Sequence, residues 1–497
     1  MPTEAVLNLI GGTFQAASTD RFEDVFNPST GEIIAQVPLS GREDAQAAVI
    51  AAGRALSSWS QTPVIDRARV MFRYRDLLEQ HFDDVARLIT RENGKTLAES
   101  RAELRRGIEV VEFACGIPSL FMGRSLADVA RDVDADVMRH PVGVCAGITP
   151  YNFPAMVPMW MFPIALVCGN SFILKPSEKV PLTANRIGEL LLQAGCPEGV
   201  FNVLHGGREC VDALLESPGV AAISFVGSTP VAREIYRRGA EYGKRVQAAG
   251  GAKNFCLVMP DADPVLAVQA LAAASFGCGG QRCMATSIAV PVGDAADSLI
   301  DRLAQHAGSL RVGPTHEGDD VDLGPLIRAQ HVERVCSHIE SAAEGGATVV
   351  LDGRRSEPGG GFFLDPSIVD HVAPEMDVAR TEIFGPLLSV IRAATLNEAL
   401  RMGRDCEFGN GASIFTRDGY AARRFRDDFP AGMIGINVGV PAPMAWFPFT
   451  GWNNSFFGDL HVQGTEGIQF YTRQKVTLTR WLKPTGDDPR DPVWRGS

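Results

Sequence analysis

Between residues 171 and 226 the sequence reads SFILKPSEKVPLTANRIGELLLQAGCPEGVFNVLHGGRECVDALLESPGVAAISFV. Short apolar runs typical of buried strands alternate there with segments of helical period. The runs are Phe172–Leu174, Phe201–Leu204 and Ala221–Val226, and the helical segments are Leu182–Ala194 and Cys210–Glu216. Strands and helices that alternate at this spacing predict a parallel sheet with helices on both faces, so the chain belongs to the α/β class.

The same alternation continues downstream and restarts after Pro260-Asp261. At 497 residues the chain is too long for one ordinary hydrophobic core. We therefore predict two doubly wound α/β domains, the second beginning near residues 256–262. The remaining predicted strands are Phe255–Met259 and Ser287–Val292, and the helices are Pro230–Gly239, Pro264–Phe276, Ala295–Ala307 and Ala329–Gly345.

Upstream of this sheet the chain is predicted to be mostly helical. Residues 7–40 alternate apolar runs with turn signals, which is typical of a small hairpin, and residues 42–119 have helical period. Residues 153–168 form a long apolar run, but prolines interrupt it and it ends before it could span a bilayer. We expect a buried helix there.

Residues 125–142 alternate apolar with charged side chains around an acidic turn, a pattern typical of an exposed two-stranded ribbon. The segment 467–482 returns to an alternating strand pattern. An exposed ribbon has unpaired edges, so another chain or domain could cover it, but an ordinary surface hairpin fits the pattern equally well. The residues leave both alternatives open.

The composition narrows the class of partner. The net charge of −12 argues against a nucleic-acid surface, although it permits local basic pockets. Ten cysteines without a CxxC pair favour free thiols in a reducing compartment, and no His, Cys or carboxylate cluster has metal-ligand spacing. The first residues have no features of a secretory signal or transit peptide. We expect a cytoplasmic protein with no metal and no membrane partner.

A candidate nucleophile lies in the stretch Phe276-Gly277-Cys278-Gly279-Gly280-Gln281-Arg282-Cys283-Met284-Ala285. A cysteine used for packing normally has bulky apolar neighbours. Here three glycines leave room for a substrate beside the Cys283 sulfur, and Arg282 directly precedes it. Cys283 is therefore the candidate, although one cysteine among ten could simply fill space.

A candidate anion site lies in Phe225-Val226-Gly227-Ser228-Thr229-Pro230, which reads as a strand, a tight turn and a helix start. Free backbone amides and the helix dipole there favour a pyrophosphate at Gly227 and Ser228. By itself the turn is a weak signal, because many α/β turns contain Gly-Ser. Neither the GxGxxG nor the P-loop pattern occurs in the chain.

Five motifs together are more specific than any one of them. They are Pro150-Tyr151-Asn152-Phe153-Pro154, Lys175-Pro176-Ser177-Glu178, Phe225-Val226-Gly227-Ser228, Gly280-Gln281-Arg282-Cys283 and Glu382-Ile383-Phe384-Gly385-Pro386. In this order and at these separations they resemble the aldehyde dehydrogenase superfamily over essentially the whole chain. Within it, residues 142–178, 282–285, 451–461 and 470–473 are most similar to the CoA-acylating methylmalonate-semialdehyde dehydrogenases.

The resemblance implies an organisation for the whole chain. Residues 1–124 and 143–255 would form a NAD-binding domain, and residues 256–450 a catalytic domain. Residues 125–142 and 467–485 would form a β-ribbon for oligomerisation, which implies a homodimer or homotetramer.

The resemblance also implies roles for single residues. Cys283 would attack an aldehyde, and its thiolate would need stabilisation from backbone dipoles and from Arg282. The Asn152 amide and the Cys283 N–H would donate to the resulting oxyanion. NAD is favoured over NADP, because a carboxylate at the adenosine ribose repels a 2′-phosphate. The residues that would contact NAD are Lys175 and Glu178 at that ribose, Gly227 and Ser228 at the pyrophosphate, Glu382 at the nicotinamide ribose, and Phe384 and Phe153.

Two arginines fall where the methylmalonate-semialdehyde branch binds its substrate. Arg106 and Arg282 could each present paired N–H donors to a carboxylate while the aldehyde end meets Cys283. Arg105 competes with Arg106, since adjacent helical residues point about 100° apart and only one can face the pocket.

The segment Val246-Gln247-Ala248-Ala249-Gly250-Gly251-Ala252-Lys253 departs from the hydrolytic members of the family. Those have a glutamate that activates water where this chain has Ala249, and an alanine methyl cannot accept a proton. The CoA-acylating branch also lacks the glutamate but has asparagine, so Ala249 differs from both.

Together these features predict oxidation of malonate semialdehyde or its 2-methyl form through a Cys283 thioester, with NAD as cofactor and CoA as acyl acceptor. The products would be acetyl-CoA or propionyl-CoA and carbon dioxide. Two alternatives remain: a non-acylating dehydrogenase of another carboxylated semialdehyde, and a catalytically silent binding protein on the same scaffold.

Overall fold

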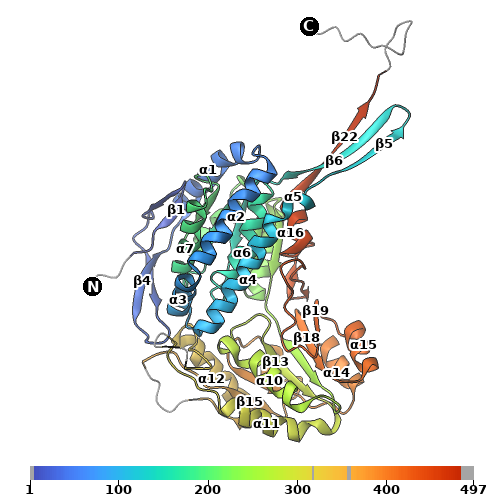
Figure 1. The fold of residues 1–497 in the computed structure, drawn as a ribbon. Helices are drawn as coiled ribbons and strands as arrows, with labels where there is room; N and C mark the ends of the chain where they lie inside the picture. Colours follow the sequence, from blue (N-terminus) through green and yellow to red (C-terminus); the bar gives the residue numbers. More distant parts are fainter. Residues whose placement is uncertain (1–4, 316–317, 319, 355–359, 483–497) are drawn as a thin grey trace.

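Two large sheets carry the fold, and a smaller three-stranded ribbon projects from the body beside them (Figure 1). The structure is a computed structural model in which residues 5–315, 318, 320–354 and 360–482 are described. The alternation of strands and helices predicted from the sequence is confirmed in both sheets.

The first sheet has eight strands, of which the five central ones are parallel. At its edges the hairpin at the N-terminus and a short strand near the C-terminus pair antiparallel, so the sheet is not parallel throughout. In spatial order the strands are β2 (Thr13–Gln15), β1 (Asn8–Ile10), β9 (Phe201–Val203), β8 (Ser171–Lys175), β7 (Val144–Ile148), β10 (Val220–Val226), β11 (Arg245–Ala249) and β21 (Phe456–Phe457).

Alternate residues of these strands enter two different cores, as the period of a strand requires. Phe172 and Leu174 pack with one set of helices, while Ile173 between them packs with the other. The first set is α2 (Val64–Gln80), α3 (Phe82–Asn93), α4 (Leu97–Cys115), α6 (Met156–Val167) and α7 (Pro181–Gln193), and the second is α1 (Arg42–Trp59), α8 (Arg208–Glu216) and α9 (Thr229–Glu241). The sheet is therefore doubly wound.

The second sheet has seven strands and the same construction, with antiparallel pairing only at the edge formed by its first two strands. Phe255 and Leu257 face one core, and Cys256 and Val258 face the other. The strands are β14 (Thr348–Leu351), β15 (Ser367–Asp370), β16 (Leu387–Val390), β13 (Thr286–Pro291), β12 (Asn254–Val258), β18 (Gly411–Phe415) and β19 (Met433–Ile436). Helices α12 (Ala329–Glu344), α14 (Leu396–Arg404) and α15 (Gly419–Asp428) cover one face, and α10 (Pro264–Phe276) and α11 (Ala296–Gly308) the other.

Short elements link these layers. The hairpin predicted at residues 7–40 is in fact two strand pairs, because the β1–β2 pair joins the first sheet while the second pair stands apart. The short elements are β3 (Phe22–Phe26), β4 (Ile33–Pro38), α5 (Ile117–Leu120), η1 (Gly277–Gly280), η2 (Gly293–Ala295), α13 (Asp377–Arg380), β17 (Phe408–Gly409) and β20 (Trp452–Asn453).

The apolar run at 153–168 is the buried helix that we expected. Every residue of α6 from Val157 to Val167 is buried in the core below the first sheet. Among the described residues, no helix combines the length and apolar character needed to cross a membrane.

The ribbon consists of β5 (Arg124–Ala130), β6 (Val133–Pro141) and β22 (Thr472–Arg480), with β6 in the centre. The prediction of a strand beginning at 467 was wrong, because residues up to 470 belong to the short helix α16 (Gly464–Phe470). Gly464, Gly467 and Ile468 are buried at helical spacing, so the helix packs on the body before the chain turns into the ribbon. Residues 483–485 of the predicted ribbon lie outside the described part of the chain.

The domain division at 1–124 with 143–255, and 256–450, stays a prediction. The first sheet draws its strands from residues 8–15, 144–249 and 456–457, and the second from residues 254–436. The parallel strands β7, β10 and β11 of the first sheet end at the site described next, whereas β12, β13 and β16 of the second sheet begin there.

Candidate active site

Two cavities meet at Cys283, in the loop between η1 and β13. The larger is a cleft of about 820 Å³, and the smaller is a pocket of about 240 Å³. Cys283 and Phe153 line both of them. Groups bound in the cleft and in the pocket would therefore reach the same thiol, as a reaction between two bound molecules at a nucleophile requires.

The loop before Cys283 has three consecutive residues in the left-handed region. Cys278, Gly279 and Gly280 have φ of 53°, 60° and 67°. A Cβ at Gly280 would lie 2.1 Å from the carbonyl oxygen of Gly385, and one at Gly277 would lie 2.5 Å from the guanidinium of Arg282. These two glycines make room for other protein atoms, and not for a substrate as expected from the sequence.

Two asparagines that the sequence reasoning missed hold the backbone of Cys283, the candidate nucleophile. The side-chain amides of Asn254 and Asn410 each donate to the carbonyl oxygen of Cys283 at 2.9 Å. Asn254 opens β12 and Asn410 directly precedes β18. The only sequence signal was a polar residue at the start of a buried strand, which is too common to identify a site.

The thiol of Cys283 is held in its protonated form in this structure. Burial and then the neighbouring charge of Glu382 raise its pKa to about 12. The backbone N–H groups of Cys283 and Met284 and the charge of Arg282 act in the opposite direction, but they are outweighed. The expectation that dipoles and Arg282 favour the thiolate has the right sign, but burial dominates.

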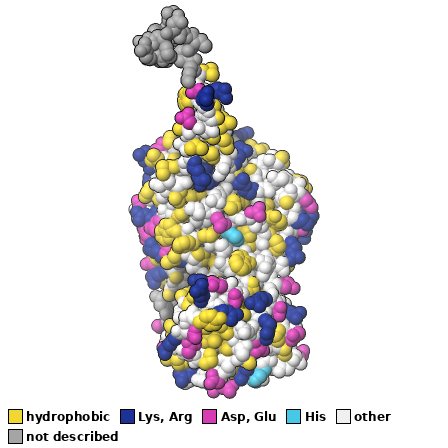
Figure 2. All heavy atoms as spheres, turned by 90° about the vertical axis from the view of Figure 1, so that its right-hand side faces the viewer, with side chains coloured by type: hydrophobic (Ala, Val, Ile, Leu, Met, Phe, Trp, Pro, Cys, Tyr) yellow, Lys and Arg dark blue, Asp and Glu magenta, His cyan; other side chains and the backbone are white. Residues whose placement is uncertain are grey.

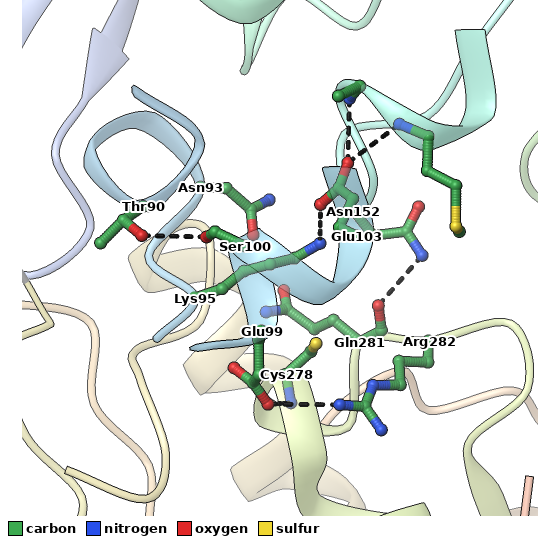
Figure 3. Close-up of polar contacts among 12 residues, drawn as sticks. Thr90, Asn93, Lys95, Glu99, Ser100, Glu103, Asn152, Cys278, Gln281 and Arg282 are labelled. Carbon is green, nitrogen blue, oxygen red and sulfur yellow. Dashed lines mark hydrogen bonds and ion pairs between the residues drawn. The ribbon is translucent and has the colours of Figure 1, made fainter. Parts of the chain in front are cut away.

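Asn152 lies beside the nucleophile loop, as its proposed role requires. It follows the carboxyl end of β7 and is buried, and its side chain lines the cleft that contains Cys283. One N–H of its amide donates to the carbonyl oxygen of Gln281 at 3.0 Å, as Figure 3 shows. The amide has a second N–H, which leaves a donor for an oxygen bound near Cys283.

The turn after β10 offers the cleft a helix N-terminus. Gly227, Ser228 and Thr229 line the cleft at the start of α9. Within the described chain the Ser228 side chain forms no capping hydrogen bond, and the first turn of α9 has no acidic side chain. The free N–H groups and the helix dipole therefore suit an anion such as a pyrophosphate.

Lys175 and Glu178, the two residues expected at the adenosine ribose, lie at the end of β8 but outside the set of described residues that line the cleft. Glu178 accepts from Lys179 at 2.8 Å and from Lys175 at 3.5 Å. Burial tends to raise the pKa of Glu178, but the two lysines outweigh it and hold the pKa at about 2. The carboxylate is therefore negative at every physiological pH, as repulsion of a 2′-phosphate needs.

Glu382 and Phe384 both line the cleft together with Cys283. The Glu382 carboxylate accepts from the backbone N–H of Ala252 at 3.0 Å, and burial raises its pKa to about 7. Phe384 has a left-handed backbone, with φ of 59°, and its ring meets that of Tyr151 edge to face at 6.0 Å. A left-handed phenylalanine is rare and costs energy, which is typical of a residue fixed for function.

The smaller pocket brings together the two arginines predicted to bind a carboxylate. Arg106 from α4 and Arg282 both line it with Cys283. Arg106 donates to Glu109 at 3.0 Å, and Arg282 to Glu99 at 3.2 Å. The competing Arg105 instead pairs with Glu79 of α2 at 3.0 Å. Of the two neighbours, Arg106 is the one that reaches the pocket.

Ala249 ends β11 in the first sheet, and it is buried. Its carbonyl oxygen accepts from the N–H of Gly227, which links it to the turn of the candidate anion site. Of the described residues that line the cleft, Glu382 and Glu407 carry carboxylates. Among the described residues no group of three or more His, Cys, Asp or Glu side chains is arranged to hold a metal ion.

The chain is similar to known proteins over most of its length. The family model described as "Aldehyde dehydrogenase family" matches residues 14–477. Malonate-semialdehyde dehydrogenase 1 of Geobacillus thermodenitrificans is 50% identical over 480 residues, which cover 96% of this chain and 99% of that protein.

Two solved structures share the fold closely. The methylmalonate-semialdehyde dehydrogenase of Oceanimonas doudoroffii has a TM-score of 0.95 and 48% identity, covering 97% of this chain and 99% of the other. A protein of Sinorhizobium meliloti 1021 assigned as a methylmalonate-semialdehyde dehydrogenase, and complexed with NAD, has a TM-score of 0.96 and 44% identity, covering 98% and 99%.

Proposed function

Because this chain belongs to the aldehyde dehydrogenase family, we propose that it oxidises malonate semialdehyde or its 2-methyl form and transfers the acyl group to CoA. One observation supports this more than any other: Cys283 lies between a pocket with two arginines and a cleft with a free helix N-terminus. The pocket suits an aldehyde with a carboxylate at its far end, and the cleft suits a dinucleotide.

In the proposed first step the carboxylate of the substrate binds Arg106 and Arg282, and the aldehyde carbon meets Cys283. The thiol of Cys283 passes its proton to water in the cleft, and the sulfur adds to the carbonyl carbon. The carbonyl oxygen becomes an oxyanion that accepts from the Asn152 amide and the Cys283 N–H, and contacts of this kind lower the barrier by about 3–4 kcal/mol.

NAD fits the residues present in the cleft. Gly227 and Ser228 at the start of α9 would hold its pyrophosphate, Glu382 and Phe384 would contact the nicotinamide half, and Phe153 would line the meeting point. Lys175 and Glu178 would hold the adenosine ribose from the end of β8. When bound, NAD accepts the hydride that leaves the substrate carbon, so that Cys283 carries a thioester.

In the proposed second step the thiol of CoA attacks the thioester carbon, the bond to the Cys283 sulfur breaks, and the proton of the CoA thiol passes to the departing sulfur. Loss of carbon dioxide from the β-carboxylate leaves an enolate that takes a proton from water, which yields acetyl-CoA from malonate semialdehyde or propionyl-CoA from the 2-methyl form. The carboxylate must first leave the two arginines. The decarboxylation then needs no further residue.

A hydrolytic reaction is the second candidate, and the half-buried Glu382 favours it. With a pKa raised to about 7 and a place in the cleft with Cys283, this carboxyl could accept a proton from water. The enzyme would then release a carboxylic acid and would not need CoA.

Arg106→Leu and Arg282→Leu test the proposal that these two arginines bind the carboxylate of the substrate. Each change removes one charge-assisted contact to the acid, so kcat/KM for malonate semialdehyde should fall about 10- to 100-fold. The value for propionaldehyde, which has no carboxylate, should change less than about threefold. Steady-state NADH formation with both aldehydes measures the difference.

Arg105→Leu is the matched control, because the guanidinium of Arg105 pairs with Glu79 and lies away from the pocket. It should leave both kcat/KM values near wild type. Equal losses on the two aldehydes in the Arg106 and Arg282 variants would show that these arginines support the fold or the thiol and do not bind an acid.

We further propose that the chain forms a homodimer or homotetramer through the ribbon and works in the cytoplasm. Register pairs Ala135 of the central strand with Leu478 on one side and Leu126 on the other, and Val137 with Val476, so apolar side chains share one face of the ribbon. Leu126, Val476 and Leu478 are exposed. Figure 2 shows hydrophobic side chains on the projecting ribbon, together with basic and acidic ones. Ten free thiols suit a reducing compartment.

Light scattering at micromolar concentration should give at least twice the chain mass of 53.4 kDa. Val476→Asp with Leu478→Asp should shift the mass toward the monomer, because the charges would be buried in the interface. Val265→Asp, at a similarly exposed site on α10, serves as the control and should leave the mass unchanged. A wild-type monomer would contradict the proposed assembly.

A further inference from the structure

The carboxylate of Glu99 connects helix α4 to the loop that carries the nucleophile. One oxygen, Oε1, accepts from the backbone N–H of Cys278 at 2.6 Å and from Arg282 at 3.2 Å. The other, Oε2, accepts from the backbone N–H of Thr96 at 3.2 Å. Figure 3 shows the contacts of the Glu99 carboxylate to Cys278 and to Arg282. These contacts join segments that are 179 residues apart in the sequence.

The contact to Cys278 supports a strained part of the loop. Cys278 is a non-glycine residue with φ of 53°, a conformation that costs about 1 kcal/mol or more. It is also buried, so its N–H needs a partner from the protein. Glu99 provides that partner, and the two glycines that follow take up the rest of the turn.

The contact to Arg282 fixes the direction of its guanidinium. Besides Glu99, Arg282 donates to the carbonyl oxygen of Ala273 at 3.3 Å and packs against the backbone at Gly277, where no side chain could fit. The Cys278 side chain also hydrogen-bonds this guanidinium, which has five donors in all. With these contacts Arg282 lines the pocket next to Cys283.

Helix α4 sets the spacing between the two substrate arginines. Glu99 and Arg106 are seven residues apart, which places them on one face of the helix and about 10.5 Å apart along its axis. Both side chains line the pocket. The helix therefore carries Arg106 directly and holds Arg282 through Glu99.

We propose that Glu99 is a positioning residue that aims Arg282 at the carboxylate of the substrate and so sets the preference for carboxylated aldehydes. This inference rests on the proposed function of the pocket. Its competitor is a structural role alone, since Glu99 also forms a capping box with Thr96 at the start of α4.

The experiment compares four proteins: wild type, Glu99→Ala, Glu99→Gln and Thr96→Ala. For each we would measure kcat/KM with malonate semialdehyde and with propionaldehyde, and the midpoint of thermal unfolding. The ratio of the two kcat/KM values is the decisive quantity, because loss of a helix cap or of loop order lowers both values together.

Glu99→Ala should lower the ratio about tenfold or more, since a charge-assisted contact to Arg282 is lost. Glu99→Gln should recover most of the ratio, because its amide oxygen can still accept from Cys278 and Arg282. Thr96→Ala, which removes the hydroxyl half of the capping box, should lower the unfolding temperature and leave the ratio within about twofold.

A double substitution tests the inference even if Glu99→Ala disturbs the loop at Cys278. In the Arg282→Leu background, Glu99→Ala should not lower the ratio further, because its effect passes through Arg282. If Glu99→Ala does not fold, Glu99→Asp retains the charge but withdraws the oxygens by one methylene, and it should lower the ratio.

The outcomes separate this inference from the proposed function. If wild type shows no preference for malonate semialdehyde over propionaldehyde, the proposed function fails. If wild type has the preference and Arg282→Leu loses it, while Glu99→Ala retains the ratio, then Glu99 is only a cap and this inference is overturned.

Discussion

Replacing Cys283 by alanine is expected to abolish NADH formation. The sulfur is the group proposed to bond to the aldehyde carbon. Among the described residues, Cys283 is the one cysteine that lines the larger cleft, and Cys278 is the one other cysteine that lines the smaller pocket. Loss of a covalent nucleophile should lower kcat by at least about a thousandfold. Steady-state absorbance of NADH with malonate semialdehyde and CoA measures this directly.

The variant should still bind NAD with nearly wild-type affinity, because the proposed contacts come from the start of α9 and from Glu382. Isothermal titration with NAD checks that the cleft is intact. Cys336→Ala is the matched control: this thiol is also partly exposed, but it lies on α12 outside both cavities, so activity should persist. Turnover above about one per cent in purified Cys283→Ala would sink the assignment.

Local signals in the sequence predicted some elements to the residue. Helix α10 runs from Pro264 to Phe276 as expected. Asp263 caps it by accepting from the N–H groups of Val265 and Leu266, proline occupies its first turn, and Gly277 ends it. Each of these signals acts within a few residues, so they are readable without the fold.

Other features depend on contacts that the sequence does not contain. Residues 467–470 alternate like a strand, yet they are helical because Gly467 and Ile468 pack on the body. The roles of Asn254, Asn410 and Glu99 arise from partners that are far away along the chain. Local patterns cannot reveal such partners.

The protonation state of the Cys283 thiol also could not be predicted without the fold. The sequence places Arg282 next to Cys283, which suggests a lowered thiol pKa, but burial and Glu382 raise it to about 12. The burial of a side chain is set by the packing of both sheets around the cleft. The motifs thus pointed to Cys283 as a candidate, and its surroundings in the structure explain its raised pKa.

Ala249 leads to the second large effect, the dependence of turnover on CoA. The residue is buried at the end of β11, and its methyl group cannot take a proton from water. A thiolate is a stronger nucleophile than water and needs less help from a base. Water should therefore attack the Cys283 thioester slowly, and CoA should attack it quickly.

Ala249→Glu should supply the missing base and raise turnover without CoA. Ala249→Gln is the matched control, since glutamine has the length of glutamate but no basic carboxylate. It should not raise turnover without CoA. Glu382→Gln addresses the alternative base in the cleft: if Glu382 activates water, this variant should lose the residual turnover without CoA.

The acyl transfer to CoA is tested most directly by rapid mixing of enzyme, NAD and malonate semialdehyde, with and without CoA. Without CoA we expect a burst of about one NADH per active site followed by a steady rate at least about 100-fold slower. Addition of CoA should accelerate the steady phase and give acetyl-CoA. Equal steady rates with and without CoA would contradict the account and establish the hydrolytic reaction instead.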